Sequence, residues 1–247
     1  MRLLTLLTLL FIACAPVRHT VNNVQNMELE PQDPVGQTSE AEEAAPAEAP
    51  KEDVVHIKFN TDVNGLSALI AIGLIDRGAA VGAKAILLEL DTPGGSVKAG
   101  FRLSKAIENS PVPVICVVDG EADSMGFYIL QACDVRLMTK RSVLMAHQPQ
   151  IGGEMYGPKE QWKNWADALK ALEWAMIEHM VAKMKITSEE MAKRIEGGQM
   201  WWFDWREAIH TGAVDGTVQS VRAVLNDLKN GEVKTLDMPA EEIAPAN

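Results

Sequence analysis

Residues 114 to 147 read VICVVDGEADSMGFYILQACDVRLMTKRSVLMAH, and this stretch decides the fold. An apolar, β-branched run over residues 112–118 predicts a buried strand that ends at Asp119-Gly120. Ser124 then opens an apolar segment of helical length, residues 125–133. A strand that breaks sharply into a helix displays the residue at the break, and the first N–H groups of the helix lack intrahelical partners. The pattern therefore indicates a turn that displays Ser124 as a nucleophile.

A candidate base follows the serine in the same stretch. His147 comes 23 residues after Ser124, at the end of the apolar run 142–146, and it is the only histidine of the stretch. A serine hydroxyl is a weak nucleophile at neutral pH and needs such a base. Each residue also has a structural interpretation, since serine is a common helix N-cap and a histidine at a strand end is commonly a hydrogen-bonded part of the fold. The sequence thus predicts a Ser–His pair that either catalyses a reaction or supports the fold.

A second turn of special composition precedes this stretch. Residues 85–90 predict a buried strand, residues 97–109 have helical periodicity, and Asp-Thr-Pro-Gly-Gly-Ser stands between them at 91–96. Strands that alternate with helices predict an α/β fold with a largely parallel sheet, whose functional groups gather beyond the carboxyl ends of the strands. The Gly-Gly turn either only leads into the helix or also points N–H groups into a cleft. In the second case, the N–H groups of Gly95 and Met125 form an oxyanion hole.

These motifs carry a family resemblance. Asp-Thr-Pro-Gly-Gly-Ser at 91–96, Ala-Asp-Ser-Met-Gly at 122–126, Leu-Met-Ala-His-Gln-Pro at 144–149 and Gly-Ala-Val-Asp at 212–215 resemble the signature segments of the Clp protease proteolytic subunit. They occur in the same order and at nearly the same spacings, and the resemblance covers about residues 54–224. It implies a ClpP/crotonase-like spiral of β-α-β units with a mostly parallel sheet.

The resemblance also implies an activity, a serine-type endopeptidase without cofactor or metal. Ser124 would be the nucleophile, His147 the base, and the Gly95 and Met125 amides the oxyanion hole. The expected partners are short or unfolded peptides and further copies of the chain in a homo-oligomeric ring. No Walker motif is present, and we expect no ATPase partner.

The third member of the family's triad is missing. Counting back from Gly212, the aspartate of the family falls on Met200, and methionine cannot orient or charge-stabilise an imidazole. Glu196 and Asp204 are close enough in sequence to substitute, and Asp123 stands directly before the nucleophile. The charge of Asp123 either disfavours the oxyanion or helps to orient the base.

Three alternatives to a Ser–His peptidase remain open at this point. A serine–lysine dyad, as in signal-peptide peptidases, would use Lys159 or Lys163. A non-catalytic oligomeric scaffold that retains the fold would explain Met200. A crotonase-type enzyme of acyl-thioesters is suggested by Asp119-Gly120 and by Ala-Cys-Asp at 132–134, although the other motifs fit peptidases better.

The first fourteen residues predict export. Arg2 precedes an apolar run, residues 3–13, that is too short to span a bilayer. Phe-Ile-Ala-Cys at 11–14 resembles a bacterial lipobox, which would make Cys14 the lipidated N-terminus of a membrane-anchored lipoprotein of the bacterial cell envelope. The alternative is an ordinary signal peptide cut near Ala15. Export would permit a disulfide, but sequence cannot decide whether Cys116 and Cys133 are bonded or are two buried thiols.

Composition and charge divide the rest of the chain. Residues 15–53 are rich in Glu, Ala and Pro and predict a disordered acidic tether, residues 54–230 form the peptidase-like domain, and residues 231–247 form an acidic tail. Nine acidic and two basic residues lie between positions 18 and 53, and four acidic and one basic residue lie after 230. These two segments hold nearly all of the net charge of −11, and no nucleic-acid partner is expected.

Two apolar clusters follow the site motifs. Residues 158–185 predict a long helix with an apolar stripe, for which we expect core packing. The family resemblance implies in addition a contact between protomers around Met176 and Met180. The aromatic cluster at 201–205 would line a substrate groove or a subunit contact. The members of the stripe are Leu169, Leu172, Met176, Met180 and Met184.

Overall fold

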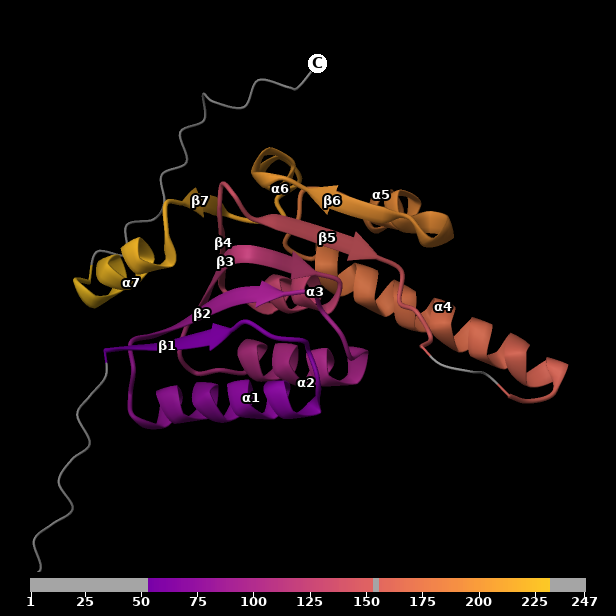
Figure 1. Ribbon diagram of the computed structural model, residues 1–247, viewed down its shortest axis with the longest axis horizontal. Coiled ribbons are helices and arrows are strands. Elements are labelled where there is room, and N and C mark those ends of the chain that lie inside the picture. The colour runs from indigo at the N-terminus through magenta and orange to yellow at the C-terminus, as the bar shows by residue number, and fades with distance from the viewer. Residues whose placement is uncertain (1–52, 153–155, 232–247) are drawn as a thin grey trace, which may run out of the picture. The chain divides into compact units, whose positions relative to one another are not determined.

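The computed structural model describes residues 53–152 and 156–231 (Figure 1). The predicted leader with Cys14, the tether apart from Asp53 and the acidic tail beyond Gly231 lie outside the described residues. Within the described ranges, no helix combines the length and the apolar character that a bilayer crossing requires.

Strands and helices alternate along the first half of the chain, and helices predominate in the second. The elements are β1 (Val54–Phe59), α1 (Gly65–Ala80), β2 (Ala85–Thr92), α2 (Val97–Glu108), β3 (Val114–Asp123), α3 (Met125–Ala132), β4 (Val135–Thr139), β5 (Val143–His147), α4 (Lys159–Val181), α5 (Ser188–Ile195), the 3-10 turn η1 (Glu196–Gly198), β6 (Met200–Phe203), α6 (Trp205–Thr211), β7 (Gly216–Val218) and α7 (Val221–Lys229).

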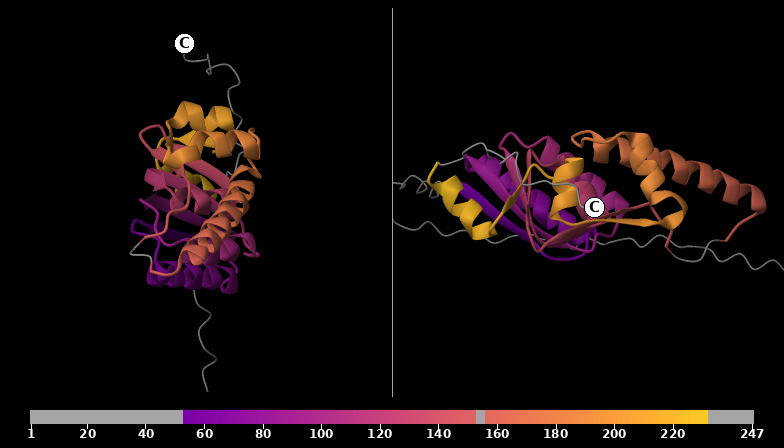
Figure 2. Two further views of the ribbon diagram at one scale, coloured as in Figure 1. Left: turned by 90° about the vertical axis from the view of Figure 1, so that its right-hand side faces the viewer. Right: turned by 90° about the horizontal axis from the view of Figure 1, so that it is seen from above.

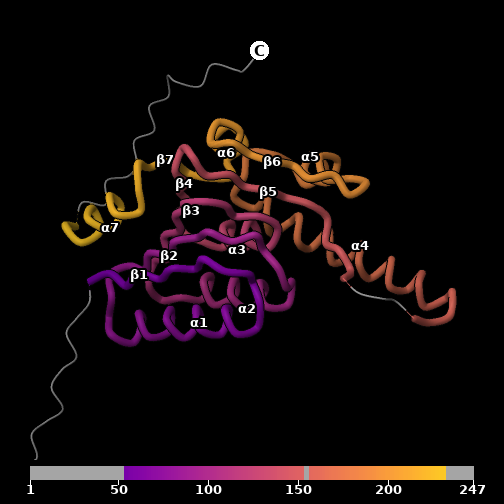
Figure 3. Tube along the Cα trace, viewed as in Figure 1, coloured from indigo at the N-terminus to yellow at the C-terminus, as the bar shows by residue number. Residues whose placement is uncertain are grey.

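The seven strands form one sheet that forks at β3. The main path runs β1-β2-β3-β4-β7 and is parallel throughout. The first half of β3 pairs with β4, whereas its last three residues, 121–123, pair with β5. The strand β6 pairs with the other edge of β5 in the antiparallel direction. The Cα trace in Figure 3 shows the resulting spiral of strand–helix–strand units. The predicted α/β fold with a mostly parallel, ClpP/crotonase-like sheet is confirmed.

Two apolar layers cover the sheet. Alternate residues of the central strands face opposite sides, so Leu88 and Cys116 belong to the core under α1, α2 and α3, whereas Leu87 and Val117 face the other side. Val221, with its neighbours on α7, packs on that second side. Because both faces are covered, the strands are continuously apolar, which explains why residues 85–90 and 112–118 lack polar alternation.

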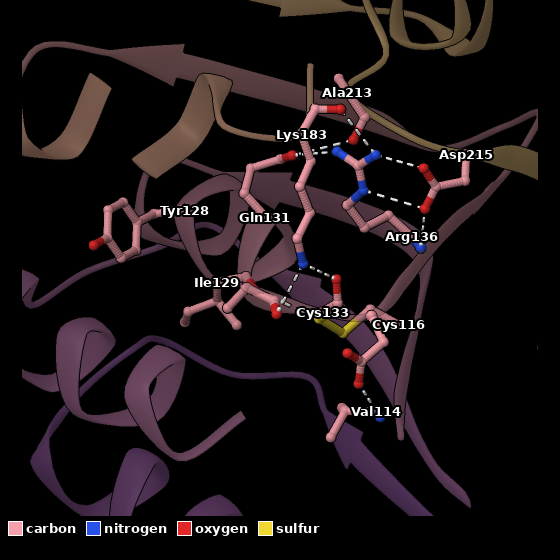
Figure 4. The surroundings of a disulfide bond; sticks show 12 residues. Val114, Cys116, Tyr128, Ile129, Gln131, Cys133, Arg136, Lys183, Ala213 and Asp215 are labelled. Atoms are coloured by element: carbon pink, nitrogen blue, oxygen red, sulfur yellow. Dashed lines mark hydrogen bonds and ion pairs between the residues drawn. A yellow bond between two sulfur atoms is a disulfide. The ribbon is translucent and has the colours of Figure 1, made fainter. Parts of the chain in front are cut away.

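A disulfide ties the nucleophile-bearing helix to the sheet. Cys116 of β3 and Cys133 at the end of α3 are bonded, with their Cα atoms 5.9 Å apart (Figure 4). The Lys183 ammonium donates to the Cys133 carbonyl at 2.7 Å, and Arg136 is held nearby by Asp215 and by other oxygen acceptors. Of the two states that the sequence left open for these cysteines, the structure has the disulfide.

The long helix α4 differs from the sequence-based prediction in length and in role. It ends at Val181, before the predicted Lys185, and its outer part projects beyond the sheet (Figures 1 and 2). Met176 and Met180 are buried in the core of their own subunit, which confirms the core-packing interpretation. The contact between protomers that we predicted around these two residues is therefore wrong. A homo-oligomeric ring stays a prediction.

The aromatic cluster at 201–205 is mostly part of the fold. Phe203 is fully buried and stacks on Phe127, and Trp201 is 7% exposed. Trp205 lies under the Lys140 ammonium, and Trp202 is half exposed. Only Trp202, among these four aromatic residues, offers a large exposed face to a substrate or a subunit.

Candidate active site

The turn between β3 and α3 holds Ser124 in a strained backbone conformation. Its φ is +55°, and it is the sole residue other than glycine with a positive φ in the ranges that the structure describes. The Ser124 N–H donates to the Met145 carbonyl at 2.7 Å, which fixes the turn against β5. Ser124 occupies the N-cap position of α3, but its side chain makes no capping bond, so capping does not account for the serine side chain. Strain of this kind costs of the order of 1–3 kcal/mol, persists where the surrounding structure imposes it, and is concentrated at functional sites.

The Gly-Gly turn after β2 packs directly against this elbow. A Cβ atom on Gly94 would lie 2.5 Å from the Asp123 carbonyl oxygen and 2.8 Å from the Ser124 Cβ. Only glycine permits so close an approach between the two turns. The two motifs that the sequence placed on successive strands are thus in direct contact.

His147 completes the pair at the end of β5. Its Nε2 lies 2.8 Å from the Ser124 Oγ, within hydrogen-bonding distance. In the tautomer that makes Nε2 the acceptor, the proton sits on Nδ1. That Nδ1 atom is buried and has no hydrogen-bond partner among the residues that the structure describes. The structure therefore brings the predicted nucleophile and base together and leaves the other imidazole nitrogen unpaired.

The two predicted oxyanion donors line the same pocket as the Ser–His pair. Gly95 forms a parallel bridge with Val63, in which the Gly94 carbonyl and the Ser96 N–H make the bonds. The N–H of Gly95 points away from Val63, because successive backbone groups alternate. Met125 is the first residue of α3, where N–H groups have no intrahelical partner. Both residues border the pocket that also holds Ser124 and His147.

The pocket has a volume of about 190 Å³ and one apolar side. Met176 and Met180 reach it from α4, more than 50 residues along the chain from Ser124. The sequence predicted their burial but gave no signal that they border the site, since helical periodicity identifies a face and not its neighbour. The lining residues are Gly95, Val97, Ser124, Met125, Ala146, His147, Pro149, Gln150, Met176 and Met180.

The position of the missing aspartate faces His147. Met200 is the register partner of His147 in the antiparallel β5–β6 pair, and its side chain is 54% exposed. A carboxylate at this position would lie beside the imidazole. The sequence-based count that assigned the triad position to Met200 therefore agrees with the register.

Two of the substitute acids are engaged elsewhere. The Asp204 carboxylate caps α6 by accepting from the N–H groups of Arg206 and Glu207, each at 2.9 Å. Glu196 lies in η1 and borders a different groove, beside Glu173. Neither acid borders the pocket that contains Ser124.

The two lysines of the alternative dyad are also outside the site. Lys159 and Lys163 lie on the outer, solvent-exposed part of α4, and neither borders the pocket around Ser124. The structure therefore does not bring a lysine to the nucleophile within the described residues. The prediction of a serine–lysine dyad that uses Lys159 or Lys163 is therefore wrong.

The remaining acid, Asp123, also does not border the pocket, but it directly precedes the nucleophile and is buried. Its side chain is 6% exposed, and its Oδ1 has no hydrogen-bond partner in the described part of the chain. Burial, and then the negative charge of Glu121, raise the pKa of the Asp123 carboxyl from 3.8 to about 6. A buried group of this kind beside a nucleophile is typical of a functional site.

Comparison with known proteins agrees with the motifs. Residues 53–236 match the family model described as the NfeD1b N-terminal domain. The ATP-dependent Clp protease proteolytic subunit 1 of Chlamydia trachomatis is 32% identical over 146 residues, which is 58% of this chain and 72% of the relative. The chain belongs to the ClpP-like family, as an NfeD1b N-terminal domain.

Two further relatives carry the same printed name. The subunit 1 of Chlamydia pneumoniae is 32% identical over 148 residues, covering 59% of this chain and 74% of the relative. The subunit 1 of Streptomyces avermitilis is 33% identical over 140 residues, which is 55% of this chain and 62% of the relative. The ClpP-like part of the chain thus includes the strands and helices that hold the Ser124 pocket.

Proposed function

We propose that this protein is a serine peptidase that hydrolyses short or already unfolded peptides. The observation that carries the proposal is the 2.8 Å separation between the Ser124 Oγ and the His147 Nε2, on a strained turn whose pocket is also bordered by Gly95 and Met125. A nucleophile within reach of a base and of two backbone donors is the arrangement that acyl transfer requires.

The geometry supports a two-step reaction. As the Ser124 Oγ attacks the peptide carbonyl carbon, His147 accepts the hydroxyl proton, and the Gly95 and Met125 N–H groups donate to the developing oxyanion. The protonated imidazole then gives its proton to the leaving amine, which departs as the C–N bond breaks. Water, deprotonated by His147, attacks the acyl-enzyme ester and releases the second product with Ser124 restored.

The proposal includes a preference for substrates without folded structure. The pocket of about 190 Å³ accommodates one side chain, and Met176 and Met180 make one side of it apolar. The relatives are named as ATP-dependent. We propose that this protein acts without an ATPase, because its N-terminus has the pattern of an exported lipoprotein and ATP is not available outside the cytoplasm.

Labelling of Ser124 tests this function. A fluorophosphonate probe is expected to modify wild-type protein, and peptide mapping is expected to place the adduct on Ser124, because the probe reacts only with an activated serine. Ser124→Ala should abolish labelling, whereas Ser220→Ala, which alters a serine that caps α7, should label as wild type does. Wild-type protein that is unlabelled and cleaves no small peptide ester would overturn the proposal.

Export and lipidation are a second part of the proposal. The apolar leader that ends at Cys14 supports it, and so does the Cys116–Cys133 disulfide, since such bonds persist in oxidising compartments. Full-length protein expressed in a bacterium is expected to partition into detergent and to carry acyl chains, which anchor it stably. Cys14→Ser should block the acylation. Recovery of the wild type wholly in the aqueous phase, with no acyl mass, would contradict the anchor.

A non-catalytic scaffold is the second candidate, favoured by one observation. Met200 stands where a carboxylate would orient His147, and the Nδ1 of that imidazole has no partner in the described residues. On this alternative the fold serves binding or assembly, and neither labelling nor turnover is expected.

A further inference from the structure

Two buried polar atoms at the site lack partners and are complementary. Of the described residues, only three have a buried side-chain nitrogen or oxygen without a hydrogen-bond partner, and two of these are Asp123 and His147. The atoms concerned are the carboxylate Oδ1 and the imidazole Nδ1. A carboxylate accepts hydrogen bonds, and Nδ1 donates one when Nε2 accepts from Ser124. Unpaired buried polar atoms are costly, so two such atoms in one site require an explanation.

The register of the sheet places both side chains on one face. Asp123 is the parallel register partner of Met145 on β5, and His147 follows Met145 by two residues. Side chains alternate along a strand, so Met145 and His147 point to the same side as Asp123. From strand spacing and rise, the Cα atoms of Asp123 and His147 are diagonal neighbours about 8 Å apart, which two side chains directed toward each other can bridge.

The opposite face is occupied by the core, which agrees with this placement. Ala122, Leu144 and Ala146 alternate with Asp123, Met145 and His147, and all three belong to the apolar cluster under the helices, from which Ala146 also borders the pocket. The catalytic face of β5 and β6 otherwise carries Met145, Trp202 and Met200, which are poor acceptors for an imidazole N–H. Asp123 is therefore the acid that the register brings closest to His147.

We propose that Asp123 is the positioning residue for His147, in place of the carboxylate that the family carries at position 200. This role rests on the proposed peptidase function. The Asp123 carboxylate accepts the Nδ1 hydrogen bond when substrate closes the pocket, since catalytic hydrogen bonds are often long in the free enzyme and shorten in the complex. It holds the tautomer in which Nε2 accepts the Ser124 proton, and it stabilises the imidazolium without itself taking the proton.

The charge state of Asp123 gives the role a pH signature. With a pKa of about 6, the carboxyl is mostly ionised above that pH and mostly protonated below it. Glu121, two residues away on β3, is the charged neighbour that raises this pKa. On β5 the titratable neighbour is His147, whose Nδ1 the carboxylate would face. Met145, Trp202 and Met200, the other residues on this face of β5 and β6, carry no titratable group. Activity is expected to fall as pH decreases through 6, because Asp123 takes up a proton and the neutral carboxyl no longer accepts the Nδ1 hydrogen bond as a carboxylate does.

The decisive experiment combines Asp123→Asn with Met200→Asp. Asp123→Asn is expected to lower kcat/KM for a small peptide ester at pH 8 by about 10- to 100-fold, with KM little changed, which is the scale on which a partner of a metal-bound imidazole acts. In the pH profile of kcat/KM, the fall in activity at low pH should also depend on one proton fewer in this variant than in the wild type. Met200→Asp should restore most of the loss in the Asp123→Asn protein, because that position faces His147, and should add little to the wild type.

Controls separate this role from a structural one. Glu121→Gln should leave the maximal kcat/KM unchanged and move the fall in kcat/KM at low pH to a lower pH, because it removes a charge that raises the pKa of Asp123. Asp123→Ala provides a second variant should the asparagine protein misfold, and the same loss is expected. If the wild type is labelled and active, and the Asp123 variants have the same or a higher maximal kcat/KM, the positioning role is overturned but the peptidase function is not. Absence of Ser124 labelling in both the wild type and Met200→Asp would overturn the peptidase function and this role with it.

Discussion

Replacing His147 by alanine is expected to lower kcat for a small peptide ester by about ten-thousand- to millionfold. The structure makes His147 the base within reach of the nucleophile, with its Nε2 2.8 Å from the Ser124 Oγ. Without it, the hydroxyl must attack with its proton in place or lose it to water. A residual rate above that of water is expected, because the Gly95 and Met125 donors and the pocket remain.

The control for this variant is a second histidine that is remote from the pocket. His210 lies in the last turn of α6 and is exposed, so His210→Ala should retain wild-type turnover. Steady-state kinetics on both variants, with circular dichroism to verify the fold, provides the measurement. Turnover in His147→Ala within tenfold of the wild type would show that another group acts as the base.

The sequence predicted the paired turns because their signals are local. The apolar run before Ser124, the break after it and the Gly-Gly motif at 94–95 each specify a backbone conformation within a few residues. Their meeting at one edge follows from the parallel order of β2 and β3, which strand–helix alternation also predicts. The sequence could thus predict that Ser124 and His147 form a pair, although it could not predict the distance between their side chains.

What the sequence could not predict depends on pairing between distant segments. The Asp119-Gly120 pair indicates the end of a strand, yet β3 continues to Asp123, because its last residues pair with β5. Whether Asp123 faces His147 follows from that register, so the sequence left its role open. The same holds for the Cys116–Cys133 bond and for the approach of Met176 to the pocket, since each requires a distance that a linear pattern does not contain.

Replacing Gly95 by alanine is expected to reduce kcat by about 100- to 1,000-fold, the effect of losing one oxyanion donor. Gly95 has a φ of +144°, which residues with a side chain rarely adopt. A Cβ atom there would lie 2.4 Å from the Val63 carbonyl oxygen, which is backbone and cannot rotate aside. The bridge between Val63 and residues 94–96 must therefore shift, and the Gly95 N–H moves with it out of line with the oxyanion.

Gly82→Ala distinguishes this effect from ordinary backbone strain. Gly82 also has a positive φ, +70°, but no atom lies within 4 Å of a Cβ built on it, and it is in the turn after α1, away from the pocket. Gly82→Ala is expected to lose about 1–3 kcal/mol of unfolding free energy from strain, and Gly95→Ala is expected to lose more, because its Cβ also meets backbone. Only Gly95→Ala should lose turnover, with kcat falling while KM changes little, since the donor acts on the oxyanion and not on the bound ground state. Equal kcat in the two variants, measured where denaturant curves show both to be folded, would remove the Gly95 amide from the oxyanion hole and leave that role to Met125 alone.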